Sequence, residues 1–264
     1  MWINVVKEFG VKFLSFNILG GSVVYYLAKI LKIKYRGYKF SNPKKSALYA
    51  IAAITISTCM ITGLMILSNS KNTSQVASSV QPYTYNLGMV INSAISWLIL
   101  LSPILIMKKV RKETWATTGV SKHNYKESIL IGAILGIITL VIVILYSSTS
   151  LSVIRGNLNL SAFWALFNFA VAGFAEEFMY RGYLQIRLME WIGKWKGLIL
   201  TSMVMALIHI PQRMAYGLSP NEAIISAVLL IPMSLIMGYT MIKTENILAP
   251  GIYHTFYNWI NVLM

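Results

Sequence analysis

Residues 127–147 read ESILIGAILGIITLVIVILYS, a stretch of 21 residues whose polar side chains lie almost entirely at its two ends. A helix needs about 20 mainly apolar residues to cross the hydrocarbon core of a bilayer. A helix on the surface of a soluble domain would instead show a polar face along its whole length. This stretch therefore predicts a transmembrane helix.

The same pattern recurs along the chain on both sides of this stretch. The segments between the apolar blocks are too short to fold alone, and the 264-residue chain is 56% hydrophobic and only 12% charged. An average soluble domain carries about twice that share of charge. We therefore predict an all-α fold, a polytopic membrane helix bundle of about eight transmembrane helices with no soluble domain. The seven further blocks are residues 13–31, 46–68, 87–107, 161–181, 197–212, 222–242 and 247–263.

Lysine and arginine are unevenly divided between the two ends of these predicted helices. Of the 23 basic residues, 18 fall at residues 29–45, 108–126, 181–196 and 243. Cytoplasmic connections of membrane proteins carry an excess of positive charge, so this partition predicts that both termini lie on the non-cytoplasmic side. Lys7 and Lys12 precede the first block, and residues 1–31 could alternatively be a signal anchor or a surface helix.

The net charge of +15 does not indicate nucleic acid, because no basic stripe is interleaved with exposed aromatic residues. We expect membrane lipid as a partner and no nucleic acid. The composition, rich in Ile, Lys and Asn, is typical of a low-GC Gram-positive bacterium, which favours a bacterial plasma membrane. Cys59 is the single cysteine and cannot form an internal disulfide.

Three local features add to this layout. Residues 69–86 are rich in Ser, Asn, Thr and Gln and indicate a loop on the outer side. Gly132 and Gly136 form a small-xxx-small pair, which is typical of close packing between membrane helices. Residues 183–196 mix apolar side chains and Trp with Arg and Lys, which predicts an interfacial helix on the cytoplasmic surface.

The acidic residues limit the chemistry that the chain can perform. All eight are Glu, and the sequence contains no Asp. This excludes aspartyl dyads, Ser-His-Asp triads and the Asp–Mg²⁺ sites of Walker-type nucleotide-binding proteins. Only three His are present, and the H-E-x-x-H motif of helical zinc proteases is absent.

One block ends in AEEFMYRG, residues 175–182, which places two carboxylates deep in the membrane. Counted from residue 161, Glu176 lies roughly 22 Å along the helix, and a carboxylate there costs roughly 3 kcal/mol. Arg181 follows Glu177 by four residues and can pair with it on the same helical face. Glu176 points about 100° away and is left for another partner. Alternatively, the two Glu simply end the helix at the membrane interface.

Three further polar residues occur in the last apolar blocks. His209 lies near the end of the sixth block, and His254 and Asn258 lie four residues apart on one face of the last block. Taken from the predicted cytoplasmic ends, Glu176 and the two His fall at comparable depths, so they can face one interior cavity. His123 lies in a loop and is not counted with them.

These residues form three motifs in a fixed order: E-E-x-x-x-R, a His four residues after a large apolar residue, and H-x-x-x-N. The set resembles the CAAX protease and bacteriocin-processing family, the Abi or Ras-converting-enzyme-like intramembrane proteases. The resemblance covers residues 161–264 and marks them as the catalytic core spans, whereas residues 1–160 match only as generic transmembrane spans. The family's second motif usually begins with Phe. Met205 stands there instead, and it can fill the same apolar volume.

The resemblance implies an intramembrane endopeptidase that cleaves a membrane-associated peptide or protein. Glu176 would be the general base on a water molecule, and His254 would orient that water. His209 and Asn258 would stabilise the oxyanion, while Glu177 and Arg181 would form a supporting ion pair. We expect no cofactor, although Glu176, His209 and His254 are also a set of ligands that zinc accepts.

Two other functions fit the same sequence. A non-catalytic relative would act as a bacteriocin immunity or membrane scaffold protein. A proton-coupled transporter would use the intramembrane Glu and His as a proton relay. The sequence shows no inverted repeat of the kind that many transporters contain. It predicts neither the substrate's identity nor the oligomeric state.

Overall fold

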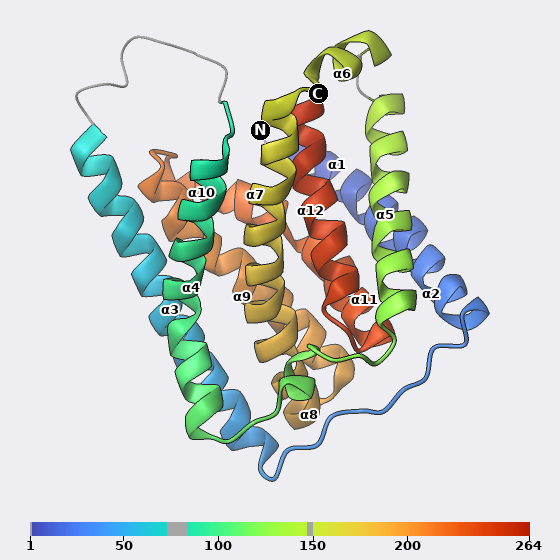
Figure 1. Cartoon of the computed structure of the whole chain (residues 1–264), viewed down its shortest axis with the longest axis vertical. Helices are drawn as coiled ribbons and strands as arrows, with labels where there is room; N and C mark the ends of the chain where they lie inside the picture. The colour runs from blue at the N-terminus through green and yellow to red at the C-terminus, as the bar shows by residue number, and fades with distance from the viewer. Residues whose placement is uncertain (1, 73–83, 147–149) are drawn as a thin grey trace.

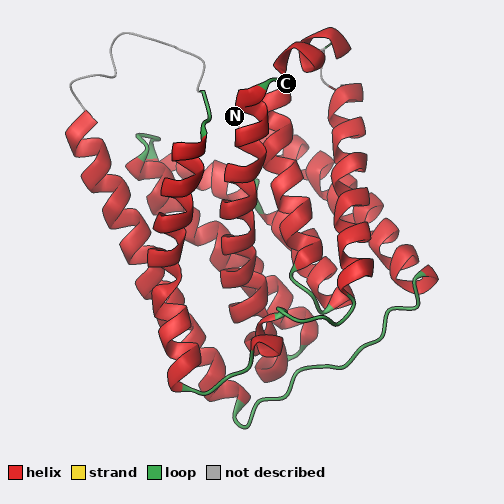
Figure 2. Ribbon diagram, viewed as in Figure 1, coloured by secondary structure: helices red, strands yellow, loops and turns green. Residues whose placement is uncertain are grey.

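The computed structural model describes residues 2–72, 84–146 and 150–264, and these residues form helices joined by short connections (Figures 1 and 2). No strand occurs in this part of the chain. The predicted all-α membrane helix bundle is therefore confirmed.

The helices follow the predicted apolar blocks closely. Their bounds are α1 Trp2–Phe13, η1 Leu14–Gly20, α2 Gly21–Ile30, α3 Pro43–Asn72, α4 Leu87–Val110, η2 Trp115–Thr118, α5 Tyr125–Tyr146, α6 Leu151–Asn157, α7 Leu160–Glu177, η3 Phe178–Gln185, α8 Ile186–Ile192, α9 Lys194–Ala215, α10 Pro220–Val228, α11 Ile231–Thr244 and α12 Leu248–Leu263. The loop predicted at residues 69–86 begins later, because α3 runs to Asn72, and most of it lies outside the described residues.

In the described part of the chain, fewer helices than the predicted eight qualify as full spans by length and composition. Among the described residues, six helices are long and apolar enough to cross a membrane, and the pair α6 and α7–α8, bent by 80°, raises this to seven at most. The last predicted block forms α12, but its 16 residues are fewer than the roughly 20 that a span needs. Eight full spans are therefore not confirmed.

The helices are arranged around α7 and α12, which lie side by side (Figure 1). The other side of α12 packs against α5, and the other side of α7 packs against α4, which in turn contacts α3. Helices α9, α10 and α11 lie behind this row. The two helices with the candidate site residues thus lie inside the bundle.

Gly132 and Gly136 allow α5 to approach α12 closely. A Cβ atom at Gly132 would lie 2.7 Å from the carbonyl oxygen of Ala249, and one at Gly136 would lie 2.8 Å from the side chain of Phe256. Both distances are too short for a real contact. The close packing predicted for this glycine pair is confirmed.

The surface helix predicted at residues 183–196 is wrong in its first half. Residues 183–188 are buried, and the helix turns outward only from Glu190 onward. Burial is tolerated because Arg187 pairs with Glu113 and donates to the carbonyl oxygen of Tyr183. Its guanidinium also lies 3.7 Å from the centre of the Tyr183 ring. The charge that suggested a surface helix is neutralised inside the protein.

The basic connections meet at one end of the bundle, whereas both termini lie toward the opposite end (Figure 1). Hydrogen bonds join these connections. Glu245 accepts from the backbone N–H groups of Arg36 and Gly37, and Asn246 donates to the carbonyl oxygens of Ser121 and His123. The connections rich in Lys and Arg thus lie at one end of the molecule, and the two termini lie toward the other end. The side of the membrane on which each end lies stays a prediction.

Candidate active site

Glu177 is the centre of a buried polar cluster inside the bundle. Its Oε1 accepts from Arg181 Nη1 at 3.1 Å and from His254 Nδ1 at 2.9 Å. Glu177 and Arg181 are fully buried, and His254 is 7% exposed. A carboxylate that pairs with Arg is ionised and can only accept, so His254 donates through Nδ1–H. The predicted Glu177–Arg181 pair is therefore present, together with an imidazole.

Close contact between α7 and α12 brings these groups together. Glu177 is the last residue of α7, Arg181 lies in the π-helical turn η3, and His254 lies in the middle of α12. A Cβ atom at Gly251 would lie 2.5 Å from the ring of Phe174. The absence of a side chain at Gly251, one turn before His254, lets the α12 backbone approach α7.

Arg181 has a second set of partners on α11 and α9. Its Nη2 donates to the carbonyl oxygen of Ser234 at 3.2 Å and to Ser234 Oγ at 3.0 Å. Its Nη1 lies 3.1 Å from the sulfur of Met205. Ser234 was not predicted as a site residue. It occurs in the apolar sequence IPMSLIMG, and no spacing to another polar residue marks it as functional. Arg181 thereby joins three helices to α12 through Glu177.

His209 is connected to this cluster through Met205. Its Nδ1 lies 2.7 Å from the carbonyl oxygen of Met205, and since a carbonyl only accepts, Nδ1 carries a proton. Met205 therefore contacts Arg181 with its side chain and fixes His209 with its backbone. The residue at which this chain departs from the usual motif is part of the site.

Glu176 and Asn258 lie beside this cluster without joining it directly. Both are partly exposed, and neither makes a hydrogen bond or ion pair with another described residue. The charge of Glu176 is close enough to interact with His254. Asn258 lines a cavity of about 530 Å³, together with Tyr257 and Arg213. These two side chains are free to bind water or a substrate.

Glu177 itself has one unused position. Its Oε2 is buried and has no hydrogen-bond partner among the described residues. A buried carboxylate oxygen without a partner costs free energy, which a bound water molecule would recover. Among the described residues, Arg181 and His254 are thus the partners of Glu177, and both bind its Oε1.

The zinc ligands named as an alternative are not assembled in this arrangement. The described residues contain no group of three or more His, Cys or Glu side chains placed to hold a metal ion. Glu176, His209 and His254 would have to move to share one ion. The expectation of no cofactor, with zinc as the alternative, stays untested, and no step proposed below depends on a metal ion.

The fold and this cluster define an integral membrane helix bundle with an intramembrane carboxylate–imidazole–guanidinium site. Residues 158–260 match the family model described as type II CAAX prenyl endopeptidase Rce1-like. The resemblance inferred from the motifs is therefore confirmed. A search of curated proteins found no match, and neither did a search of solved structures.

Proposed function

We propose that the chain is an intramembrane endopeptidase in which Glu176 activates a water molecule. One observation carries this assignment: Glu177 Oε1 is occupied by both Arg181 and His254. Of the two adjacent carboxylates, Glu176 is the one with no partner among the described residues. It is partly exposed and close to His254, as a base that must accept a proton from water requires.

His254 has the geometry of an orienting residue. Its Nδ1–H is held by the ionised Glu177 carboxylate, so the plane of the imidazole is fixed. Because Nδ1 carries the proton that it donates to Glu177, Nε2 of the neutral ring is unprotonated. Nε2 can therefore accept a hydrogen bond from the water. Glu177 and Arg181 therefore act on the reaction through the position of His254.

His209 and Asn258 are the proposed donors to the oxyanion. The Asn258 amide makes no hydrogen bond with another described residue and lines the cavity of about 530 Å³, whose lining does not include Glu176, His209 or His254. The Nδ1–H of His209 donates to the carbonyl oxygen of Met205. A neutral ring with its proton at Nδ1 can only accept at Nε2, so donation to an oxyanion requires the doubly protonated imidazolium. In that form His209 also supplies positive charge to the developing oxyanion.

The substrate is a membrane-associated peptide or protein. The match to an endopeptidase family and the several helices long and apolar enough to cross a membrane support this class of substrate. A bacterial peptide precursor fits this setting, and its sequence is a matter for experiment.

Replacement of Glu176 tests the reaction. Glu176→Gln keeps the size of the side chain but removes the proton acceptor, so we expect peptide cleavage to be lost while the protein stays folded in the membrane. Glu190→Gln makes the same change at an exposed position on α8 and should cleave normally. Cleavage of candidate membrane peptides by purified variants is the measurement.

The same variants separate a protease from a scaffold. Complementation of a deletion strain by Glu176→Gln, with cleavage absent in vitro, would favour an immunity or scaffold role. Cleavage by Glu176→Gln at the normal rate would contradict the proposed mechanism itself.

Replacement of the proposed oxyanion donors should leave a slow enzyme. Asn258→Ala and His209→Ala are each expected to lower kcat by roughly 10²–10³, the usual cost of one oxyanion donor. Asn4→Ala, the same change at an exposed position on α1, is the matched control and should cleave normally. A loss confined to KM would indicate substrate binding instead.

A further inference from the structure

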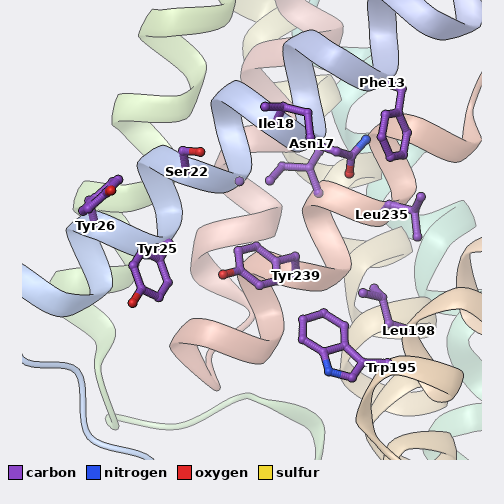
Figure 3. Close-up of a pocket in the computed structure, with 12 residues that line it drawn as sticks. Phe13, Asn17, Ile18, Ser22, Tyr25, Tyr26, Trp195, Leu198, Leu235 and Tyr239 are labelled. Atoms are coloured by element: carbon purple, nitrogen blue, oxygen red, sulfur yellow. The ribbon is translucent and has the colours of Figure 1, made fainter.

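A groove runs along the outside of the bundle between the N-terminal helices and α11, and none of its lining residues belongs to the Glu177 cluster. It has a volume of about 470 Å³. Figure 3 shows side chains of η1 and α2 on one side and of α11 and α9 on the other. The lining is mostly apolar and includes Ile18, Trp195, Leu198, Leu235, Ile236 and Tyr239.

A second hollow of about 250 Å³ continues the groove at the basic end of the bundle. The two share Tyr25, and the second is lined by Lys29, Lys32 and Lys243. Lys194 approaches from α9, with its ammonium 5.8 Å from the centre of the Tyr35 ring, which lines the same hollow. Apolar and cationic surfaces therefore follow one another along a single groove.

The lysines of this hollow have no carboxylate partner within the described residues at ion-pair distance. Lys243 instead lies over the rings of Tyr25 and Tyr239, at 5.1 and 5.4 Å from their centres. Lys194 is close enough to repel it. Glu190 also interacts electrostatically with Lys194, but the two form no ion pair. An anion placed here would relieve the repulsion.

We propose that this groove binds one anionic phospholipid, with the phosphate between Lys29, Lys32 and Lys243 and an acyl chain along the apolar part. Basic pockets between membrane helices at the membrane surface bind such head groups. Tyr25, Tyr35 and Tyr239 stand where the apolar and cationic parts meet, the position that amphipathic rings prefer at a membrane interface. A neutral lipid would leave the lysines uncompensated, and a soluble phosphate would leave the apolar groove empty.

The binding of this lipid does not depend on the proposed protease mechanism, because the groove shares no residue with the Glu177 cluster. Lipid binding is therefore measured on the full chain by native mass spectrometry and by thermal stability in detergent. The probes are phosphatidylglycerol, phosphatidylcholine and glycerol phosphate.

Removal of the lysine charges tests the head-group site. The triple variant Lys29→Gln, Lys32→Gln, Lys243→Gln should bind phosphatidylglycerol on the order of 100-fold more weakly, since each Lys near an anionic lipid contributes roughly fivefold. Lys44→Gln, Lys109→Gln, Lys122→Gln removes the same charge from exposed positions at the same end and should bind as the unchanged protein does. Equal affinity of the two triple variants would overturn the proposal.

Filling the groove with a large side chain tests whether its apolar part binds an acyl chain. A Cβ atom at Gly21 would meet nothing within 4 Å, so Gly21→Phe can occupy the groove without straining the helix. Gly63→Phe makes the same change at an equally open position on α3. Gly21→Phe should weaken phosphatidylglycerol binding at least tenfold, and Gly63→Phe should not. Glycerol phosphate binding as tightly as phosphatidylglycerol, or phosphatidylcholine competing equally, would show a different occupant and overturn the proposal.

Discussion

Arg181 illustrates at the scale of a single residue how the site and the stability of the fold are linked. It is fully buried and held by Glu177 and Ser234. Arg181→Ala leaves the Glu177 carboxylate buried without its cation, so we expect a loss of roughly 3–5 kcal/mol of unfolding free energy. The change is measured by denaturation in detergent. Arg155→Ala, at an exposed position of α6, should have little effect.

The double variant identifies the pairing. Glu177→Gln combined with Arg181→Ala removes both charges, so it should be less unstable than Arg181→Ala alone. If the effects of the two changes on unfolding free energy simply add, the pair does not act as a unit.

The same residues show which contacts a sequence can predict. The Glu177–Arg181 pair follows from four-residue spacing on one helix, and it was predicted. The bond from His254 to Glu177 joins residues 77 positions apart, and the bond from Arg181 to Ser234 joins residues 53 apart. Such contacts depend on how whole helices pack, and no periodic pattern records them. The roles of Glu176, His209 and Asn258 stay predictions.

At the scale of helices, the contact between α5 and α12 is the one that a small change should break. Gly132→Ala places a methyl group 2.7 Å from a backbone oxygen of α12, which carries His254. Because a backbone atom cannot rotate away, we expect a loss of about 1–3 kcal/mol in stability and slower cleavage. Gly63→Ala, which meets nothing within 4 Å, is the control. Thermal unfolding and peptide cleavage of the two variants should differ clearly.

The elements that were predicted less well are those in which charge is buried. The composition of residues 183–196 is that of a surface helix, and only a partner 74 positions away, Glu113, explains why Arg187 lies inside. Long apolar runs such as residues 127–147 were predicted well. A transmembrane helix requires about 20 mainly apolar residues in a row, and this requirement can be read from the local sequence without knowing any distant partner. The last block, residues 247–263, was predicted to within one residue of α12, but at 16 residues this helix is too short to count as a full span.

The whole molecule has two ends of different charge, and this makes its orientation measurable. In a Cys59→Ser background, Lys122→Cys labels the basic end and Ser152→Cys, on α6, labels the opposite end. The charge partition predicts that an impermeant thiol reagent added outside intact cells reaches Ser152→Cys and not Lys122→Cys. Labelling of both, or of Lys122→Cys alone, would mean that the orientation is wrong.

The π-helical stretch Phe178–Gln185 determines the angle around the helix axis between two buried cationic side chains. Arg181 lies within it and faces Glu177, while Arg187 lies just beyond it and faces Glu113. A π-turn holds one residue more than an α-turn, so winding the same residues as a regular α-helix would displace everything after them by one helical position. Everything downstream would then turn by about 100° relative to α7. Only one of the two ion pairs could survive that rotation, so the π-helical winding of this stretch is what allows both buried cations to keep a partner.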